Sequence, residues 1–153
     1  MDDVFEKYAQ HVFKLCFVYT KSKEDAEDLT QITFLKYLKS KPIFESEAHE
    51  RNWLMKVAVN GCKNFLLTYW QKNTVSIDNL TELSVDDTYS SEILLDVFQL
   101  PQKYRTALYL YYYEGYSIAE IAKMQGTKES TIANRLSRAR KKLKLEMEEI
   151  CDE

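Results

Sequence analysis

The segment from Glu114 to Leu143, EGYSIAEIAKMQGTKESTIANRLSRARKKL, restricts the fold of this chain more than any other stretch. Ser117 followed by Glu120 has the spacing of a capping box, which begins a helix by satisfying its free backbone amides. Gly126 breaks this short helix, and Thr127 can cap a second one. The apolar side chains of the second helix recur at helical spacing: Ile132, Leu136, Ala139 and Leu143. The pattern predicts a helix-turn-helix.

The outward side of the second helix is unusually basic. Its polar side chains are Ser130, Asn134, Arg135, Arg138 and Lys141. In a major groove, Arg and Asn can address base edges, while Lys and Arg can neutralise phosphates. A solvated basic helix that closes a helical bundle is the alternative. The coincidence of cap, short first helix, glycine turn and apolar spacing favours DNA binding.

The net charge of −3 divides unevenly along the chain. Residues 1–72 carry +1, residues 73–100 carry −6, residues 101–145 carry +7 and residues 146–153 carry −5. Local charge governs contact with DNA, so the basic module can bind it although the whole chain is acidic. The acidity of the connector can serve solubility, or it can keep the basic module from binding DNA indiscriminately.

Residues 73–89 are rich in Ser, Thr, Asp and Asn and keep no helical period. They are predicted to be a flexible acidic linker between two domains, residues 1–72 and 90–153. Because the rest of the sequence follows helical spacing, we predict an all-α protein of two small helical domains, the C-terminal one a helix-turn-helix with an acidic tail.

Several classes of protein are disfavoured. The sequence has no apolar run near the roughly 20 residues that span a bilayer, and its acidic start does not resemble a signal peptide, so a cytoplasmic protein without membrane contact is expected. The three cysteines and two histidines are widely separated, so no metal site is predicted. The sequence contains neither a phosphate-binding glycine loop nor a nucleophile paired with a general base. It therefore gives no indication of an enzyme or of a cofactor.

A helix expected from Ser22 to about Ser40 is apolar on more than one side. Ser22 and Asp25 can cap it, and Pro42 follows its end. One stripe suits packing within its own domain: Ala26, Leu29, Thr33 and Tyr37. Another lies on a different face: Asp28, Gln31, Leu35 and Leu38. A domain of about 70 residues has little protein to cover both faces, so the second stripe is interpreted as a partner-binding surface.

A further helix is expected from about Ala48 to Gln71. Its broad core stripe contains Trp53, Leu54, Val57, Ala58, Gly61, Cys62, Phe65 and Leu66. The opposite side contains basic, amide and aromatic groups: Lys56, Asn60, Lys63, Asn64, Leu67, Tyr69 and Trp70. Such a surface can stack unpaired bases of a single strand, although a solvated helix edge with a packed rim has the same composition.

The order of these elements resembles one known family. DAEDLTQITFLK and NWLMKVAVN precede the acidic linker, and LPQKYRTALYLYYYEGYSIAEIAKMQGTKESTIANRLSRARKKL follows it. This combination is similar to the sigma-70 family of RNA polymerase sigma factors, particularly the extracytoplasmic-function (ECF) group. The resemblance implies a non-enzymatic protein, monomeric when free, that binds core RNA polymerase and promoter DNA. Anti-sigma factors are common partners in the family.

The resemblance also implies roles for individual residues. The polymerase-binding helix, which contacts the clamp helices of the largest subunit, would use Asp25, Glu27, Asp28, Leu29, Gln31 and Phe34. Single-stranded minus-10 DNA would contact Lys56, Asn60, Lys63, Asn64, Tyr69 and Trp70, with residues 42–49 as a base pocket. Duplex minus-35 DNA would contact Ser117, Lys128, Ser130, Thr131, Ala133, Asn134, Arg135, Ser137, Arg138 and Lys141. Of these, the side chains expected nearest the bases are Asn134, Ser137 and Arg138, and those expected nearer phosphates are Ser117, Lys128, Arg135 and Lys141.

Three residues depart from the family pattern. Ile32 stands where Glu is usual, Asn64 where Asp is common, and Ala133 where Lys or Arg is frequent. Two alternatives stay open, and the departures at Ile32 and Asn64 bear on the second. One is a stand-alone helix-turn-helix regulator with a partner-binding helical domain, and the other is a sigma-like regulator that cannot open promoters.

Overall fold

The computed structural model describes residues 2–40, 42–72 and 97–151, with side chains placed for residues 3–40, 42–69 and 97–144. Every regular element within these ranges is helical, which confirms the all-α class. The chain divides into two compact units, residues 1–82 and 83–153. The predicted acidic linker, residues 73–89, lies outside the described residues, so its flexibility and the domain boundaries stay predictions.

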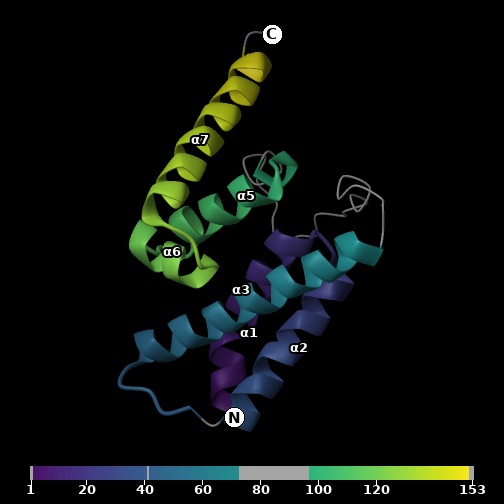
Figure 1. Ribbon diagram of the computed structural model, residues 1–153, viewed down its shortest axis with the longest axis vertical. Coiled ribbons are helices and arrows are strands. Elements are labelled where there is room, and N and C mark those ends of the chain that lie inside the picture. Colours follow the sequence, from purple (N-terminus) through teal and green to yellow (C-terminus); the bar gives the residue numbers. More distant parts are fainter. Residues whose placement is uncertain (1, 41, 73–96, 152–153) are drawn as a thin grey trace. The chain divides into compact units, whose positions relative to one another are not determined.

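The first unit is a bundle of three helices, α1 (Asp2–Thr20), α2 (Lys23–Ser40) and α3 (Glu47–Lys72), each packed on the other two (Figure 1). Its core contains fully buried side chains from α1 and α3: Val12, Leu15, Cys16, Leu54, Ala58, Val59 and Cys62. The α2 cap predicted from sequence is present, because the backbone amide of Asp25 donates to Ser22 Oγ at 3.2 Å.

Helix α2 has the two faces that its sequence indicates. Its buried residues are Ala26, Leu29, Thr30, Thr33 and Phe34. On the other side, Leu35 and Leu38 are 53% and 43% exposed, although they are large apolar side chains. Asp28 and Gln31 are exposed beside them. An apolar surface of this kind on a helix marks a place where another molecule can pack.

The second unit contains α5 (Gln102–Leu108), a π-helical turn η3 (Tyr109–Tyr113), α6 (Ile118–Gln125) and α7 (Glu129–Cys151). Its core is built on Leu110, Ile121, Ile132, Leu136 and Ala139, which are at most 1% exposed. In Figure 1, α7 is the long helix of this unit and α6 crosses near its beginning.

The tyrosine-rich segment divides into exposed and buried side chains. Tyr111 and Tyr112 lie at the surface, 37% and 54% exposed. The buried tyrosines of this segment are Tyr109 and Tyr116, and the Tyr109 hydroxyl donates to Glu114 Oε1 at 2.6 Å. A π-helical turn pairs residues five apart, so it shifts the phase that α-helical spacing assumes.

The helix-turn-helix is formed as its sequence predicts. The backbone amide of Glu120 donates to Ser117 Oγ at 3.1 Å, and the backbone amide of Ser117 donates to Glu120 Oε1 at 3.0 Å, which completes the capping box. Gly126 ends α6 in the left-handed conformation, with φ of 68°. These two local signals define where α6 begins and where it ends.

Candidate nucleic-acid interface

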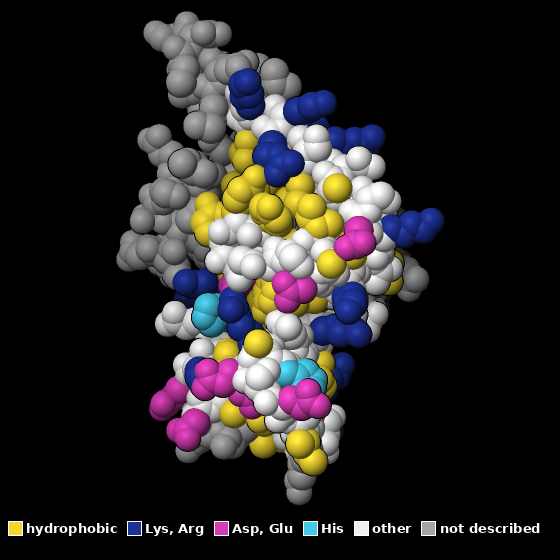
Figure 2. Space-filling model, turned by 90° about the vertical axis from the view of Figure 1, so that its left-hand side faces the viewer, with side chains coloured by type: hydrophobic (Ala, Val, Ile, Leu, Met, Phe, Trp, Pro, Cys, Tyr) yellow, Lys and Arg dark blue, Asp and Glu magenta, His cyan; other side chains and the backbone are white. Residues whose placement is uncertain are grey.

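Helix α7 presents a polar surface on the side away from the core. Five of the predicted duplex-binding side chains on it are exposed: Ser130, Ala133, Asn134, Arg138 and Lys141. Thr131, Arg135 and Ser137 are half-buried, and Lys128 is exposed just before the helix. Figure 2 shows Lys and Arg side chains projecting separately from the surface around this helix. The arrangement suits a helix that enters the major groove and meets phosphates on either side.

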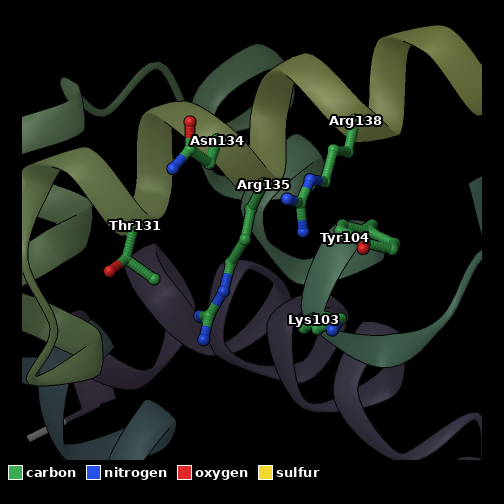
Figure 3. Close-up of a pocket in the computed structure, with 6 residues that line it drawn as sticks. All are labelled: Lys103, Tyr104, Thr131, Asn134, Arg135 and Arg138. Carbon is green, nitrogen blue, oxygen red and sulfur yellow. The ribbon is translucent and has the colours of Figure 1, made fainter.

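Two side chains that sequence reasoning did not single out lie beside this surface. Lys103 and Tyr104 of α5 line a recess of about 230 Å³ together with four residues of α7. These four are Thr131, Asn134, Arg135 and Arg138. In Figure 3, Arg135 and Arg138 project from α7 toward the side on which Lys103 and Tyr104 lie. Their position depends on how α5 packs against α7, so no local pattern could have found it.

Arg135 is held from behind by a short polar chain. One of its guanidinium nitrogens (Nη1) donates to Gln125 Oε1 at 3.1 Å, and Gln125 Nε2 donates to Thr106 Oγ1 at 3.4 Å. Gln125 and Thr106 are buried, at 4% and 0% exposure. These two hydrogen bonds connect α5, α6 and α7, and they therefore restrict the directions in which Arg135 can point.

The environment of Tyr104 is strongly cationic. Lys103 Nζ and Lys142 Nζ lie 5.1 and 5.6 Å from the centre of its ring. The interaction with the Arg138 guanidinium lowers the pKa of Tyr104 below its ordinary value, and the charges of Lys103 and Lys142 act in the same direction. A positive potential at this corner of the unit would attract an anionic group.

Arg140 marks the opposite flank of α7. Its Nη1 donates to the hydroxyl of Tyr112 at 2.8 Å. Since residues 138 and 140 lie about 200° apart on a helix, Arg140 points away from the recess.

A second polar surface lies on α3 of the first unit. Lys56, Asn60, Lys63 and Asn64 are all exposed at spacings that place them on one helix face. Leu67, one turn after Lys63, is 54% exposed. Tyr69 is half-buried and stacks on Phe65, with 6.3 Å between ring centroids. The side chain of Trp70 lies outside the described residues, so its place in the predicted minus-10 surface is untested.

The loop before α3, predicted as a base pocket, is anchored by aromatic packing. The Phe44 ring centroid lies 6.0 Å from Tyr37, 5.2 Å from His49 and 6.0 Å from Trp53. The backbone amide of His49 donates to Ser46 Oγ at 3.1 Å, which caps the start of α3. Ile43 is 92% exposed. The loop is thus held at Phe44 and at its junction with α3, and its use as a base pocket stays a prediction.

The predicted polymerase-binding residues of α2 separate into two groups. Glu27, Asp28 and Gln31 are exposed, and Asp25 is half-buried. Leu29 and Phe34 are 6% and 3% exposed. Phe34 packs on Phe5, with 5.1 Å between ring centroids. In this conformation Leu29 and Phe34 pack inside the first unit. The side chains open to a partner are the polar ones, Glu27, Asp28 and Gln31.

Two kinds of feature are absent from the described residues. No group of three His, Cys, Asp or Glu side chains in this part of the chain could hold a metal ion. None of the described helices is both long enough and apolar enough to cross a bilayer.

The fold and these surfaces define a class of protein: an all-α chain with two helical units, one of which is a helix-turn-helix with a basic recognition helix. Two family models match it in order, "Sigma-70 region 2" over residues 4–71 and "Sigma-70, region 4" over residues 99–143. The chain belongs to the sigma-70 family, and its relatives place it in the ECF group.

Curated relatives agree with this assignment, and a solved structure agrees with the fold. The ECF RNA polymerase sigma factor SigM of Bacillus subtilis is 29% identical over 153 residues, covering 94% of this chain and 93% of the relative. The ECF sigma factor SigM of Mycobacterium tuberculosis is 28% identical over 146 residues, covering 93% and 74%. The crystal structure of the Bartonella quintana sigma factor RpoE, solved with the anti-sigma factor NepR, has a TM-score of 0.74 at 20% identity and covers 96% of both chains. The last comparison supports the fold alone.

Proposed function

We propose that the chain is a sigma factor that binds core RNA polymerase and directs it to a class of promoters. The observation that carries the proposal is the presence of sigma-70 regions 2 and 4 in one chain, in family order. It is a transcription initiation factor, and we assign it no enzymatic activity of its own and place its action in the cytoplasm.

The second unit would read the minus-35 element as duplex. Helix α7 would lie in the major groove, with Asn134 and its neighbours facing base edges and Lys128 and Lys141 facing phosphates. Ser117, exposed at the beginning of α6, can offer its hydroxyl to a phosphate while its oxygen still accepts from the Glu120 amide. Each well-placed pair with a base supplies about 1–3 kcal/mol of discrimination.

The first unit would capture the minus-10 element as a single strand. The exposed amide and ammonium groups of α3 can bond to unpaired bases and to the backbone, with aromatic groups near its C-terminal end. Stacking of an unpaired base on an aromatic ring contributes roughly 1–3 kcal/mol, which favours melted over paired DNA.

The exposed side of α2 would bind the polymerase. Its carboxylates, Glu27 and Asp28, suit a basic partner surface, and the exposed Leu35 and Leu38 suit an apolar one. The family resemblance assigns this partner as the clamp helices of the largest subunit. An anti-sigma factor, as in the crystal structure of the Bartonella RpoE, is a further candidate partner.

The test is co-elution of the purified chain with core polymerase, followed by run-off transcription on a promoter library. Asp28→Lys combined with Gln31→Ala should abolish co-elution. Asp3→Lys, a charge reversal at an exposed residue of α1, is the matched control and should leave it intact. If the double variant co-eluted like the unaltered chain, the assignment of α2 would fail.

The same experiment separates the alternatives. Co-elution without transcript would indicate a sigma-like regulator that cannot open promoters, as the Ile32 and Asn64 departures could cause. Tight sequence-specific duplex binding without any association with polymerase would indicate a stand-alone regulator.

A further inference from the structure

We propose that Lys103 and Tyr104 of α5 belong to the DNA-binding surface, and that the recess they form with α7 holds one phosphate of the duplex backbone. The proposal rests on the proposed function, because it takes α7 to be the helix that enters the major groove. It adds a contact from a helix outside the helix-turn-helix.

The chemistry of the recess suits a phosphate. Three of its six lining side chains are cationic, Lys103, Arg135 and Arg138, and none is a carboxylate. The other three, Tyr104, Thr131 and Asn134, can all donate hydrogen bonds. Guanidinium groups bind phosphate oxygens with two parallel bonds, and an ammonium adds a point charge.

The size of the recess suits a single phosphate group better than a whole small-molecule ligand. Its volume of about 230 Å³ falls below the roughly 300–1,000 Å³ of pockets that enclose drug-sized ligands. A phosphodiester that enters from outside, with the rest of the nucleic acid remaining on the surface, fits such a space.

The recess lies on the flank of α7 that would face the phosphate backbone if α7 entered the major groove. Thr131, Arg135 and Arg138 follow one flank of α7 at i, i+4 and i+7, next to the outermost stripe that contains Asn134 and Lys141. An α-helix with its side chains is about 10–12 Å wide and the major groove is about 12 Å wide, so the flanks of an inserted helix face the phosphates. Lys103 and Tyr104 border this flank (Figure 3).

Two of the lining groups, Arg135 and Tyr104, are held in place before binding. Gln125 holds Arg135, and the buried Tyr104 ring lies near the ammonium groups of Lys103 and Lys142. Groups that are fixed before binding lose less conformational freedom when the ligand arrives. The structure also assigns Arg138, expected from sequence among the base contacts, to the phosphate side, because it lines the recess beside Tyr104.

The test uses the full chain bound to core polymerase on a promoter identified by the run-off experiment. Lys103→Ala should weaken promoter binding about tenfold, since a bond to a charged group is lost. It should also reduce the slope of log affinity against log salt by about 0.9. The loss should be equal for the promoter and for base-pair variants of its minus-35 element.

Arg140→Ala is the matched control, because it removes one exposed cation from the other flank of α7. It should leave the affinity and salt slope nearly unchanged. Tyr104→Phe removes only a hydroxyl and should weaken binding less than Lys103→Ala does. Equal effects of Lys103→Ala and Arg140→Ala would overturn the proposal, because only overall charge would then matter.

A second measurement locates the phosphate. Each phosphate of the minus-35 duplex is replaced singly by an uncharged methylphosphonate. One position should weaken binding of the unaltered chain, and the same replacement should have almost no effect on the Lys103→Ala variant. If the two losses added fully at every position, Lys103 would contact no single phosphate. Failure of the unaltered holoenzyme to bind any promoter would instead count against the proposed function.

Discussion

At the scale of single residues, Asn134 is the side chain that we propose reads a base. It is exposed on the outer side of α7, within the first two turns of the helix. Asn can pair with adenine through two hydrogen bonds, so Asn134→Ala should cost about 1–3 kcal/mol and relax specificity at one base pair. Competition among duplexes that differ at single base pairs measures this directly.

Lys141→Ala provides the contrast. Lys141 lies about two turns after Asn134 on the exposed side, and its ammonium should meet a phosphate. Removal should weaken binding to all sequences alike and lower the salt slope by about one. If both variants changed specificity, or neither did, the division of α7 into base and phosphate contacts would be wrong.

Gly61 offers a test of packing in the first unit. A glycine in the middle of a helix suggests a close crossing, but a Cβ added at Gly61 would meet only Leu29 Cδ2, at 3.8 Å. This is an ordinary contact, so Gly61→Ala should stabilise the unit by roughly 0.4–1 kcal/mol, mainly by restricting the unfolded chain. Urea unfolding monitored by Trp fluorescence measures the change.

Gly126→Ala is the opposite case and should destabilise the second unit, because the backbone φ of 68° at this position strains an L-residue.

At the scale of elements, sequence predicted what local signals determine. The capping box at Ser117, the glycine stop at Gly126 and the second face of α2 all follow from residues close together in the chain. What sequence could not give depends on distant packing. Phe34, which the family resemblance includes in the polymerase-binding set, packs on Phe5 of α1, and Lys103 lines a recess only through the packing of α5 on α7.

The capping box gives a prediction that separates stability from DNA binding. Ser117→Ala removes the acceptor for the Glu120 amide and should destabilise the second unit by about 1 kcal/mol. Ser117→Asp restores the cap but brings a negative charge to the surface predicted to meet a phosphate. It should therefore recover the urea midpoint and still bind promoter DNA weakly. Recovery of both properties would show that Ser117 is a cap only.

The contact between α1 and α3 has a defined pH dependence. Lys7 Nζ donates to Glu47 at the start of α3, and this hydrogen bond lowers the pKa of Glu47 below its ordinary value. A lowered carboxyl pKa stabilises the fold above the unfolded-state pKa of about 4.3, and the contribution is lost as pH falls through the folded-state value. Glu47→Gln should thus be less stable than the unaltered chain at pH 7 and equally stable at strongly acidic pH. In a Lys7→Met background the substitution should make no difference at either pH.

At the scale of the whole molecule, we expect the two proposed DNA-binding units to bind a promoter more tightly because they belong to one chain. The basic module of residues 101–145 carries +7, yet residues 73–100 and 146–153 around it carry −6 and −5. If these flanks reduce free DNA binding, promoter recognition under the proposed function depends on both units acting together on polymerase. Tethering makes the second contact intramolecular once the first has formed.

This argument predicts how transcription responds to dilution. Below saturation, run-off transcript from the intact chain should fall in proportion to its concentration. Residues 1–72 and 90–153, added as separate polypeptides, must both find the polymerase, so their transcript should fall with about the second power of dilution. The control adds the intact chain to the mixture of the two pieces, which should restore linear dependence if the pieces do not inhibit the enzyme. A linear response from the pieces alone would mean that one unit suffices for initiation, and that the linker contributes no effective concentration.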